Sequence, residues 1–374
     1  MRDEPATAHK GPTYAGNNLV NLVAELEQRL TGRSPTRGLR SDLARLIPPA
    51  RHYLLVIIDG LGAGQLSHPD APALRQSHRA GLEAPFPTTT SVSLSSIVTG
   101  LSPLQHGVIG YRQWFPDLGK VLSLLHWTDL SGRHVVYDTA AFLPAPNLWE
   151  RLSARRARGV IVQPAAFFDT PLTRMLYRGA QMRGYLSPLE VDPGYLIAGS
   201  KRTLAMVYYH AVDMAAHEAG QQSQRYAQAI TIANRLWARL ADRLPPDTVM
   251  VGSSDHGHRD IPPEGRFIFD RAETAGLRWW GDSRGLMLSG PYQRIEALAE
   301  RTGSQMILPE QLRTWLGRGK PHPELESRLP DAVLLAPDNH GLFPKGMDTR
   351  KVSHHGGLTQ AEARIPLMIQ GPGG

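Results

Sequence analysis

The sequence predicts an α/β protein in which helices sandwich a mostly parallel central sheet, with insertions over the carboxyl edge of that sheet. Two observations support this fold class. Short apolar runs of strand length alternate with segments of helical periodicity, as expected when parallel strands are buried on both faces. Acidic residues and histidines follow the ends of several runs, where open α/β sheets bind their ligands.

The expected elements follow one another along the chain. An amphipathic helix at 17–30 precedes the first strand at 53–58, a continuous apolar run that ends in Asp-Gly. Later apolar runs predict further strands at 134–138, 159–163, 204–209, 248–255 and 366–370. Helical periodicity indicates helices at 145–157, 221–243, 291–302 and 309–317.

We expect a single domain over 1–374. Its core is predicted to comprise about 50–163, 203–258 and 331–374. The segments at about 112–132, 164–200 and 259–330 are rich in proline, glycine and aromatic residues and have weak periodicity. They are interpreted as insertions over the carboxyl edge of the sheet.

The composition excludes several kinds of chemistry. The chain has 374 residues and no cysteine, so disulfides, thiolate metal sites and a cysteine nucleophile are excluded. The net charge of +7 fits a small anionic substrate, and no signature predicts a stable nucleic-acid partner. No apolar run reaches the ~18 residues that span a bilayer. Because the polar N-terminus does not resemble a signal peptide, we expect a cytoplasmic protein; the sequence does not predict its oligomeric state.

Carboxylates and imidazoles gather beside the expected strands. The residues are Asp59, Asp213, His217, Asp255, His256, His354 and His355. Each motif has an ordinary structural explanation, such as an Asp-Gly turn, a surface i,i+4 pair or a capping Asp. Together, however, they supply the oxygen and nitrogen donors that suit Zn²⁺ or similar ions. Two metal ions ~3.5–4 Å apart are a common device for phosphoryl transfer.

The stretch "FPTTTSVSLSSIVTG" at 86–100 places three threonines before an expected helix. One interpretation is a helix cap, because Ser and Thr satisfy the free amides of a first turn. The other is a nucleophile, because metal coordination lowers the pKa of a bound oxygen and a helix N-terminus favours a phosphate. The metal-ligand set favours the nucleophile.

In their order these motifs resemble the alkaline phosphatase superfamily, and more closely its nucleotide pyrophosphatase/phosphodiesterase (type I phosphodiesterase) family. The resemblance covers about 53–111, 203–258 and 350–370, and rests on "VIIDGLG", "FPTTT…IVTGLSPLQHGVIGY", "DMAAH", "SDHG" and "HHGGLTQAEARIPLMI". It implies an alkaline-phosphatase-like fold, a covalent phospho-threonine and two divalent metal ions, with zinc expected and manganese or iron as alternatives.

The resemblance also assigns roles to individual residues. Thr90 is the expected nucleophile. One metal site would comprise Asp59, Asp255, His256 and Thr90; the other would comprise Asp213, His217 and His355. His355 is preferred to His354 because it directly precedes the two glycines. Tyr111 stands where relatives carry an Asn that holds a phosphate oxygen, and is assigned to substrate binding.

The expected function is therefore hydrolysis of phosphodiester or pyrophosphate bonds, with nucleotide-type substrates. A diester is favoured over a monoester because no Lys or Arg lies between Thr90 and Arg112. The alternatives are a phosphomonoesterase, a phosphonate hydrolase or a phosphosugar mutase of the same superfamily, or a relative that binds metal or nucleotide without catalysis.

Overall fold

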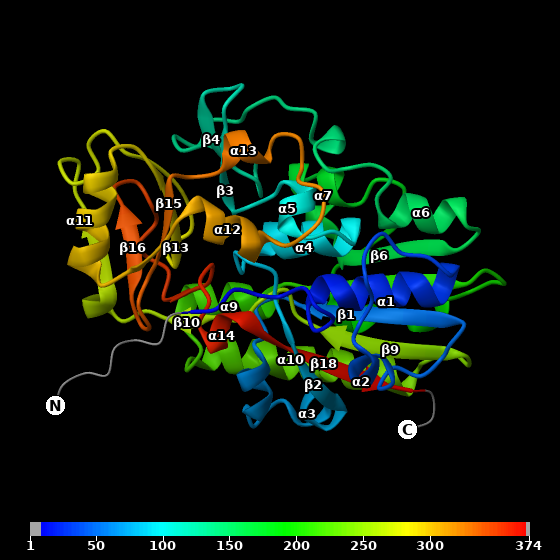
Figure 1. The fold of residues 1–374 in the computed structure, drawn as a ribbon. Helices are drawn as coiled ribbons and strands as arrows, with labels where there is room; N and C mark the ends of the chain where they lie inside the picture. Colours follow the sequence, from blue (N-terminus) through cyan, green and yellow to red (C-terminus); the bar gives the residue numbers. More distant parts are fainter. Residues whose placement is uncertain (1–8, 372–374) are drawn as a thin grey trace.

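The computed structural model describes residues 9–371 and is built around a seven-stranded sheet in the order β2-β18-β9-β1-β8-β6-β7 (Figure 1). Five neighbouring strands are parallel, and β18 runs antiparallel between β9 and β2. The strands are β1 (His52–Ile58), β2 (His78–Glu83), β6 (Arg158–Pro164), β7 (Gln181–Tyr185), β8 (Thr203–Tyr209), β9 (Thr248–Ser253) and β18 (Arg364–Gln370). The predicted mostly parallel α/β fold is confirmed.

The central strands are continuously apolar because helices cover both faces of the sheet. Every residue of β1 and of β8 is buried. Along β1, Leu55 and Ile57 pack into one hydrophobic cluster and Leu54 and Val56 into another. The first cluster includes side chains of α1 (Leu19–Thr31), α4 (Thr90–Thr99) and α6 (Leu148–Ala154); the second includes α10 (Gln224–Asp242). Figure 1 shows these helices on opposite sides of the sheet.

A second, four-stranded sheet lies beside the main one, at the left of Figure 1. Its order is β12 (Arg278–Gly281), β13 (Gly285–Ser289), β15 (Ala332–Leu335) and β14 (Gln305–Ile307). Met287 and Leu288 on β13 point into two different hydrophobic clusters, so this sheet is also buried on both faces. The helices α11 (Tyr292–Thr302) and α12 (Pro309–Leu316) contribute to those clusters.

The remaining elements are short. The strands are β3 (Arg112–Phe115), β4 (Lys120–Ser123), β5 (Thr128–Asp129), β10 (Arg259–Asp260), β11 (Arg266–Phe269), β16 (Gly341–Pro344) and β17 (Ser353–His354). The helices are α2 (Ser41–Ala44), α3 (Pro72–Ser77), α5 (Pro103–His106), α7 (Pro171–Leu176), α8 (Pro193–Leu196), α9 (Ala211–Ala219), α13 (Leu325–Arg328) and α14 (Gln360–Ala363). Single 3₁₀ turns are Ala63–Ser67, Thr139–Ala141, Ala165–Phe167, Pro188–Glu190 and Pro263–Gly265.

One predicted strand is wrong. The segment 134–138 is irregular apart from a single bridge between His134 and Thr128. Its apolar residues do not share one environment: Val135 and Tyr137 pack against the core, whereas Val136 is 99 % exposed. Tyr137 stacks on the Trp127 ring at 4.8 Å, so local aromatic packing replaces strand pairing here.

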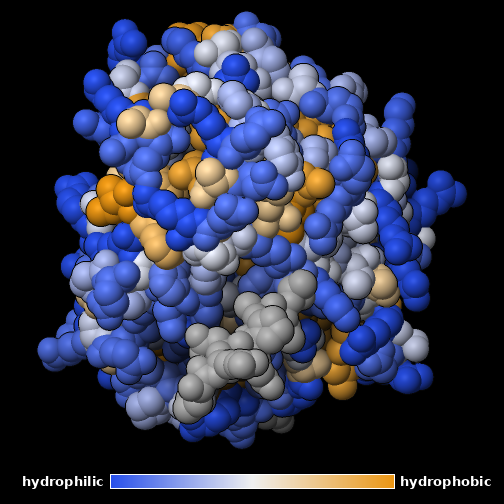
Figure 2. All heavy atoms as spheres, turned by 60° about the vertical axis from the view of Figure 1, so that its left-hand side comes forward, coloured by the Kyte–Doolittle hydropathy of each residue, from blue (hydrophilic) through white to orange (hydrophobic). Residues whose placement is uncertain are grey.

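The face shown in Figure 2 is largely hydrophilic, with its hydrophobic residues in separate small groups. Among the helices of residues 9–371, none combines the length and the apolar character needed to cross a membrane. The expectation about a signal peptide rests partly on the first eight residues, which lie outside the described residues.

Candidate active site

The parallel strands β9, β1 and β8 are neighbours, so their carboxyl ends meet at one edge of the sheet. Asp59 directly follows β1, and Asp255 follows β9 after one intervening residue. Asp213 lies on α9, which begins shortly after β8, and its amide donates to the Asp59 carbonyl oxygen at 3.0 Å. The strand order therefore brings together three carboxylates that are far apart in the sequence.

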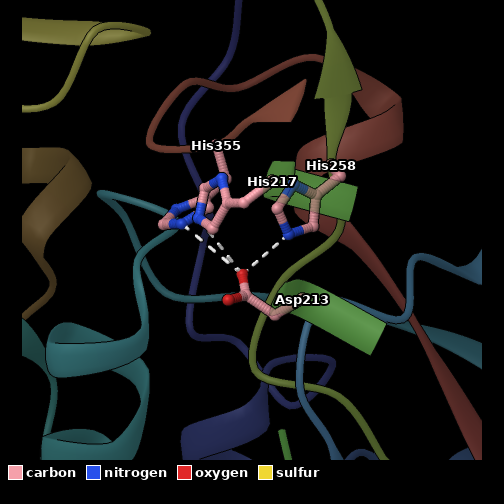
Figure 3. A group of neighbouring side chains, drawn as sticks. All are labelled: Asp213, His217, His258 and His355. Atoms are coloured by element: carbon pink, nitrogen blue, oxygen red, sulfur yellow. Dashed lines mark hydrogen bonds and ion pairs between the residues drawn. The ribbon is translucent and has the colours of Figure 1, made fainter. Parts of the chain in front are cut away.

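The ligand atoms form two groups, within each of which they lie within 4.8 Å of one another. The first group comprises Asp59, Asp255 and His256. The second comprises Asp213, His217, His258 and His355 (Figure 3). The structure thus brings together the six predicted protein ligands other than Thr90 as two sets, and it adds His258.

Three of these imidazoles are oriented by backbone carbonyls. In each ring Nδ1 donates to a carbonyl oxygen, which leaves the lone pair on Nε2 directed towards the carboxylates. The acceptors are Ser353 for His217 at 2.7 Å, Thr88 for His355 at 2.9 Å and Gly257 for His256 at 3.1 Å. Burial lowers the pKa of His217 to about 3 and also lowers the pKa of His355, so these rings are neutral and suited to bind a cation.

The carboxylates of the first group have unsatisfied oxygens. Within residues 9–371, neither Oδ1 of Asp59 nor Oδ2 of Asp255 has a hydrogen-bond partner, and both atoms are buried. Burial, together with the nearby carboxylates of Asp255 and Asp213, raises the pKa of Asp59 well above its usual range. Buried, unpaired anionic oxygens are costly unless a cation lies between them, so the group fits a divalent metal ion.

The other oxygen of each carboxylate is held by a neighbour. The Tyr208 hydroxyl, at the end of β8, donates to Oδ2 of Asp59. The Gly60 amide donates to Oδ1 of Asp255 at 3.1 Å. Sequence reasoning missed Tyr208, because its position within an apolar strand run gave no sign of a polar role.

His258 is the other residue that sequence reasoning missed. Its Nε2 lies 2.7 Å from Oδ1 of Asp213, and its Nδ1 is buried without a hydrogen-bond partner in the described part of the chain. Burial raises the pKa of Asp213, but the imidazoles of His217, His258 and His355 more than offset this and hold it well below its usual range. The only signal in the sequence was its place two residues after His256, in "SDHGH".

The three threonines occupy different environments. Thr90 is the first residue of α4, and its Oγ1 lies 3.2 Å from Nε2 of His256. Thr89 is the N-cap residue, although its side chain makes no capping hydrogen bond. The buried Thr88 hydroxyl donates to the Gly357 carbonyl oxygen at 2.8 Å. Thr90 alone of the three contacts a ligand group through its side chain, at a helix N-terminus that favours anions.

His354 belongs to neither ligand group of the described chain. Its Nδ1 lies 2.8 Å from Oγ of Ser283 and its Nε2 lies 3.2 Å from the Lys351 carbonyl oxygen. Both ring nitrogens are therefore used in hydrogen bonds, and the contact with Ser283 links β17 to the turn between β12 and β13.

A cavity of about 790 Å³ opens over the site. Its lining includes Thr90, Tyr111 and members of both ligand groups. Three cationic residues also line it: Arg112, Arg350 and Lys351. The argument for a diester, based on the absence of basic residues near Thr90 in the sequence, therefore does not hold for the folded chain.

Comparisons with known proteins give a family match and a shared fold. A family model described as type I phosphodiesterase / nucleotide pyrophosphatase matches residues 53–302. A search of curated protein sequences gives no significant match.

Solved structures share the fold. Murine ectonucleotide pyrophosphatase / phosphodiesterase 5 superposes with a TM-score of 0.64 at 17% identity, over 86% of this chain and 88% of that one. An inactive threonine-to-alanine variant of it, in complex with AMP, gives 0.65 at 17% identity and the same coverages. Phosphonoacetate hydrolase from Sinorhizobium meliloti 1021, in complex with phosphonoformate, gives 0.62 at 16% identity, over 86% of this chain and 91% of that one.

Proposed function

The chain belongs to the type I phosphodiesterase / nucleotide pyrophosphatase family, and on this premise we propose that it hydrolyses phosphodiester or pyrophosphate bonds through a covalent phospho-threonine at Thr90. The observation that carries the proposal is the position of Thr90. Its hydroxyl stands at a helix N-terminus, 3.2 Å from an imidazole of one ligand group, in the cavity shared by both groups.

The residues of the site have separate roles in the proposed reaction. Asp59, Asp255 and His256 would hold one divalent ion, and Asp213, His217 and His355 the other, with zinc as the first candidate. When bound, such ions activate a nucleophile and neutralise charge on the phosphoryl oxygens. Oγ of Thr90 loses its proton and forms a bond to phosphorus as the bond from phosphorus to the leaving-group oxygen breaks, and that oxygen departs with a proton. Water then cleaves the phospho-threonine: its oxygen bonds to phosphorus and a proton returns to Oγ of Thr90.

We propose nucleotide-type esters as the first substrates to test, because a structural neighbour binds AMP. Tyr111 lines the cavity and can donate one hydrogen bond to a phosphate oxygen. The test is turnover of bis-p-nitrophenyl phosphate against p-nitrophenyl phosphate, with metal analysis of the same sample. A diester preference with close to two ions per chain supports the proposal; a clear monoester preference would move the protein towards the phosphatases.

Variants of the threonine run test the nucleophile. Thr90→Ala is expected to lose on the order of 10³-fold or more in kcat while metal content and fold persist, because no other group replaces a covalent step. Thr90→Ser is expected to keep partial activity. Thr89→Ala is the matched control, since the Thr89 hydroxyl lies 3.2 Å from the Ser91 hydroxyl and makes no capping hydrogen bond. Its loss should cost at most about 1 kcal/mol of stability. Near-normal turnover by Thr90→Ala would contradict the assignment.

Hydrolysis of a phosphonate is a second candidate, favoured by one feature. Arg112 and Lys351 line the cavity and can receive a second anionic group, such as the carboxylate of phosphonoacetate. Asp282 also lines the cavity. Burial raises the pKa of its carboxyl, which favours the neutral form and so weakens its electrostatic repulsion of an anion. Release of phosphate from phosphonoacetate faster than p-nitrophenol from the diester would favour this function.

A further inference from the structure

One wall of the cavity is apolar and lies beside the metal-ligand groups. The apolar wall comprises Leu94, Leu125, Phe167, Leu172 and Leu176. All five belong to, or pack against, one hydrophobic cluster, and α4 packs against α7 within it. A cavity of about 790 Å³ is far larger than a phosphoryl group needs, so the substrate must carry a sizeable second part.

Three polar side chains near this wall, those of Gln163, Thr170 and Thr173, bond to one another. Nε2 of Gln163 donates to Oγ1 of Thr173 at 3.1 Å. The Thr170 hydroxyl lies 3.1 Å from the same Oγ1 and 3.1 Å from the Phe167 carbonyl oxygen. Since these donors are already used within the protein, a ligand with many hydrogen-bonding atoms would give up water here for few partners.

Phe167 connects the apolar wall to the catalytic groups. Its ring is half-buried and packs edge-on against the His210 ring at 5.0 Å. His210 is the N-cap residue of α9, the helix that carries Asp213 and His217. A group bound to phosphorus at the site would therefore meet Phe167 and the leucines behind it.

We infer that the apolar wall binds an aliphatic or simple aryl group of the substrate, so that the enzyme prefers phosphate esters of apolar alcohols to those of nucleosides. The inference rests on the proposed function, because the phosphoryl group must be anchored at the metal-ligand groups. It keeps the proposed reaction but replaces the nucleotide-type substrate by one with an apolar ester group, since leucine side chains gain from burial of methylenes but form no hydrogen bond to a nucleobase edge.

The test uses binding, so that it does not depend on turnover. Methyl-, butyl- and hexylphosphonate would be titrated into the metal-loaded protein by calorimetry, beside thymidine 5′-monophosphate. Affinity is expected to rise about two- to fourfold for each methylene, given the free energy of burying one. Hexylphosphonate is also expected to bind more tightly than the nucleotide.

Variants localise the effect. Phe167→Ala is expected to reduce the hexyl-to-methyl affinity ratio by roughly tenfold, because it removes part of the wall. Leu125 lines the cavity from the segment between β4 and β5. Leu125→Ser is expected to lower the same ratio and replaces Phe167→Ala as the test if that variant does not fold. Leu186→Ala is the matched control: Leu186 lies in the same 164–200 segment, is 91 % exposed and does not line the cavity.

The outcomes separate the two proposals. If affinity rises with chain length in the alkylphosphonate series, and rises less in Phe167→Ala, the result supports binding of the alkyl group at the apolar wall. A flat series, or tighter binding of the nucleotide than of hexylphosphonate, overturns this inference and leaves hydrolysis of bis-p-nitrophenyl phosphate untouched. Failure of the metal-loaded protein to cleave any diester would instead overturn the proposed function, whatever the binding series shows.

Discussion

The two ligand groups differ in burial and in charge. The first, Asp59, Asp255 and His256, is fully buried and sets two carboxylates against one imidazole. The second sets one carboxylate against three imidazoles and is more open, because Asp213 and His217 are only half-buried. Oxygen-rich sites suit harder cations, and imidazole-rich sites suit Zn²⁺. The comparison therefore teaches that the two groups need not have the same affinity for a given metal ion.

The largest effect is expected when a carboxylate of the first group is removed. In Asp255→Asn the buried cation site loses a negative charge, so one metal equivalent and on the order of 10³-fold in kcat should be lost. The second equivalent should remain. Elemental analysis beside steady-state kinetics checks this, and loss of both ions or of neither would contradict the separation into two groups.

Chelation should distinguish the groups next. Three members of the second group line the cavity and two of its four residues are only half-buried, whereas the first group is fully buried and only Asp59 lines the cavity. EDTA should therefore remove the metal of the second group before that of the first. Activity should disappear with the first equivalent released and return on addition of Zn²⁺. Metal analysis at successive times after EDTA addition checks this order. Simultaneous release of both equivalents would contradict the difference between the two groups.

Tyr208 should act on the first group alone. Tyr208→Phe leaves Asp59 without its hydroxyl donor, so metal affinity at that group should fall about 10- to 100-fold while affinity at the second group stays unchanged. Tyr209→Phe is the matched control, because that hydroxyl instead donates to the Ala229 carbonyl oxygen. Equal effects of the two variants would show that only packing was disturbed.

The smallest expected effect is that of His258→Gln, at the second group. His258→Gln keeps a donor for Oδ1 of Asp213, whereas His258→Ala removes it. If His258 orients Asp213, the Ala variant should lose about 10- to 100-fold in metal affinity and the Gln variant much less. If both variants lose affinity equally, His258 is a ligand in its own right.

The sequence predicted the sheet, and it pointed to six of the seven residues that the structure gathers in the two groups, because each of the six lies next to an apolar strand or in a compact motif. Tyr208 was missed because nothing within its apolar run indicates a polar role for the hydroxyl. That role is visible only once β8 is known to pair with β1, the strand that Asp59 follows. The position of His258 depends on the close approach of the chain at Gly257 to a distant segment, where an added Cβ would lie 2.0 Å from the Ala361 carbonyl oxygen. The cations Arg350 and Lys351 reach the cavity from a distant segment, which no local pattern reveals.

The central claim is that Thr90 becomes covalently phosphorylated. The most direct measurement is rapid acid quench of the metal-loaded enzyme during turnover of bis-p-nitrophenyl phosphate, followed by peptide mass spectrometry. We expect a phosphoryl ester on the peptide that contains Thr90, absent from Thr90→Ala and present in Thr89→Ala. An active enzyme that never carries this adduct, with Thr90→Ala equally active, would contradict the covalent mechanism and require direct attack by water.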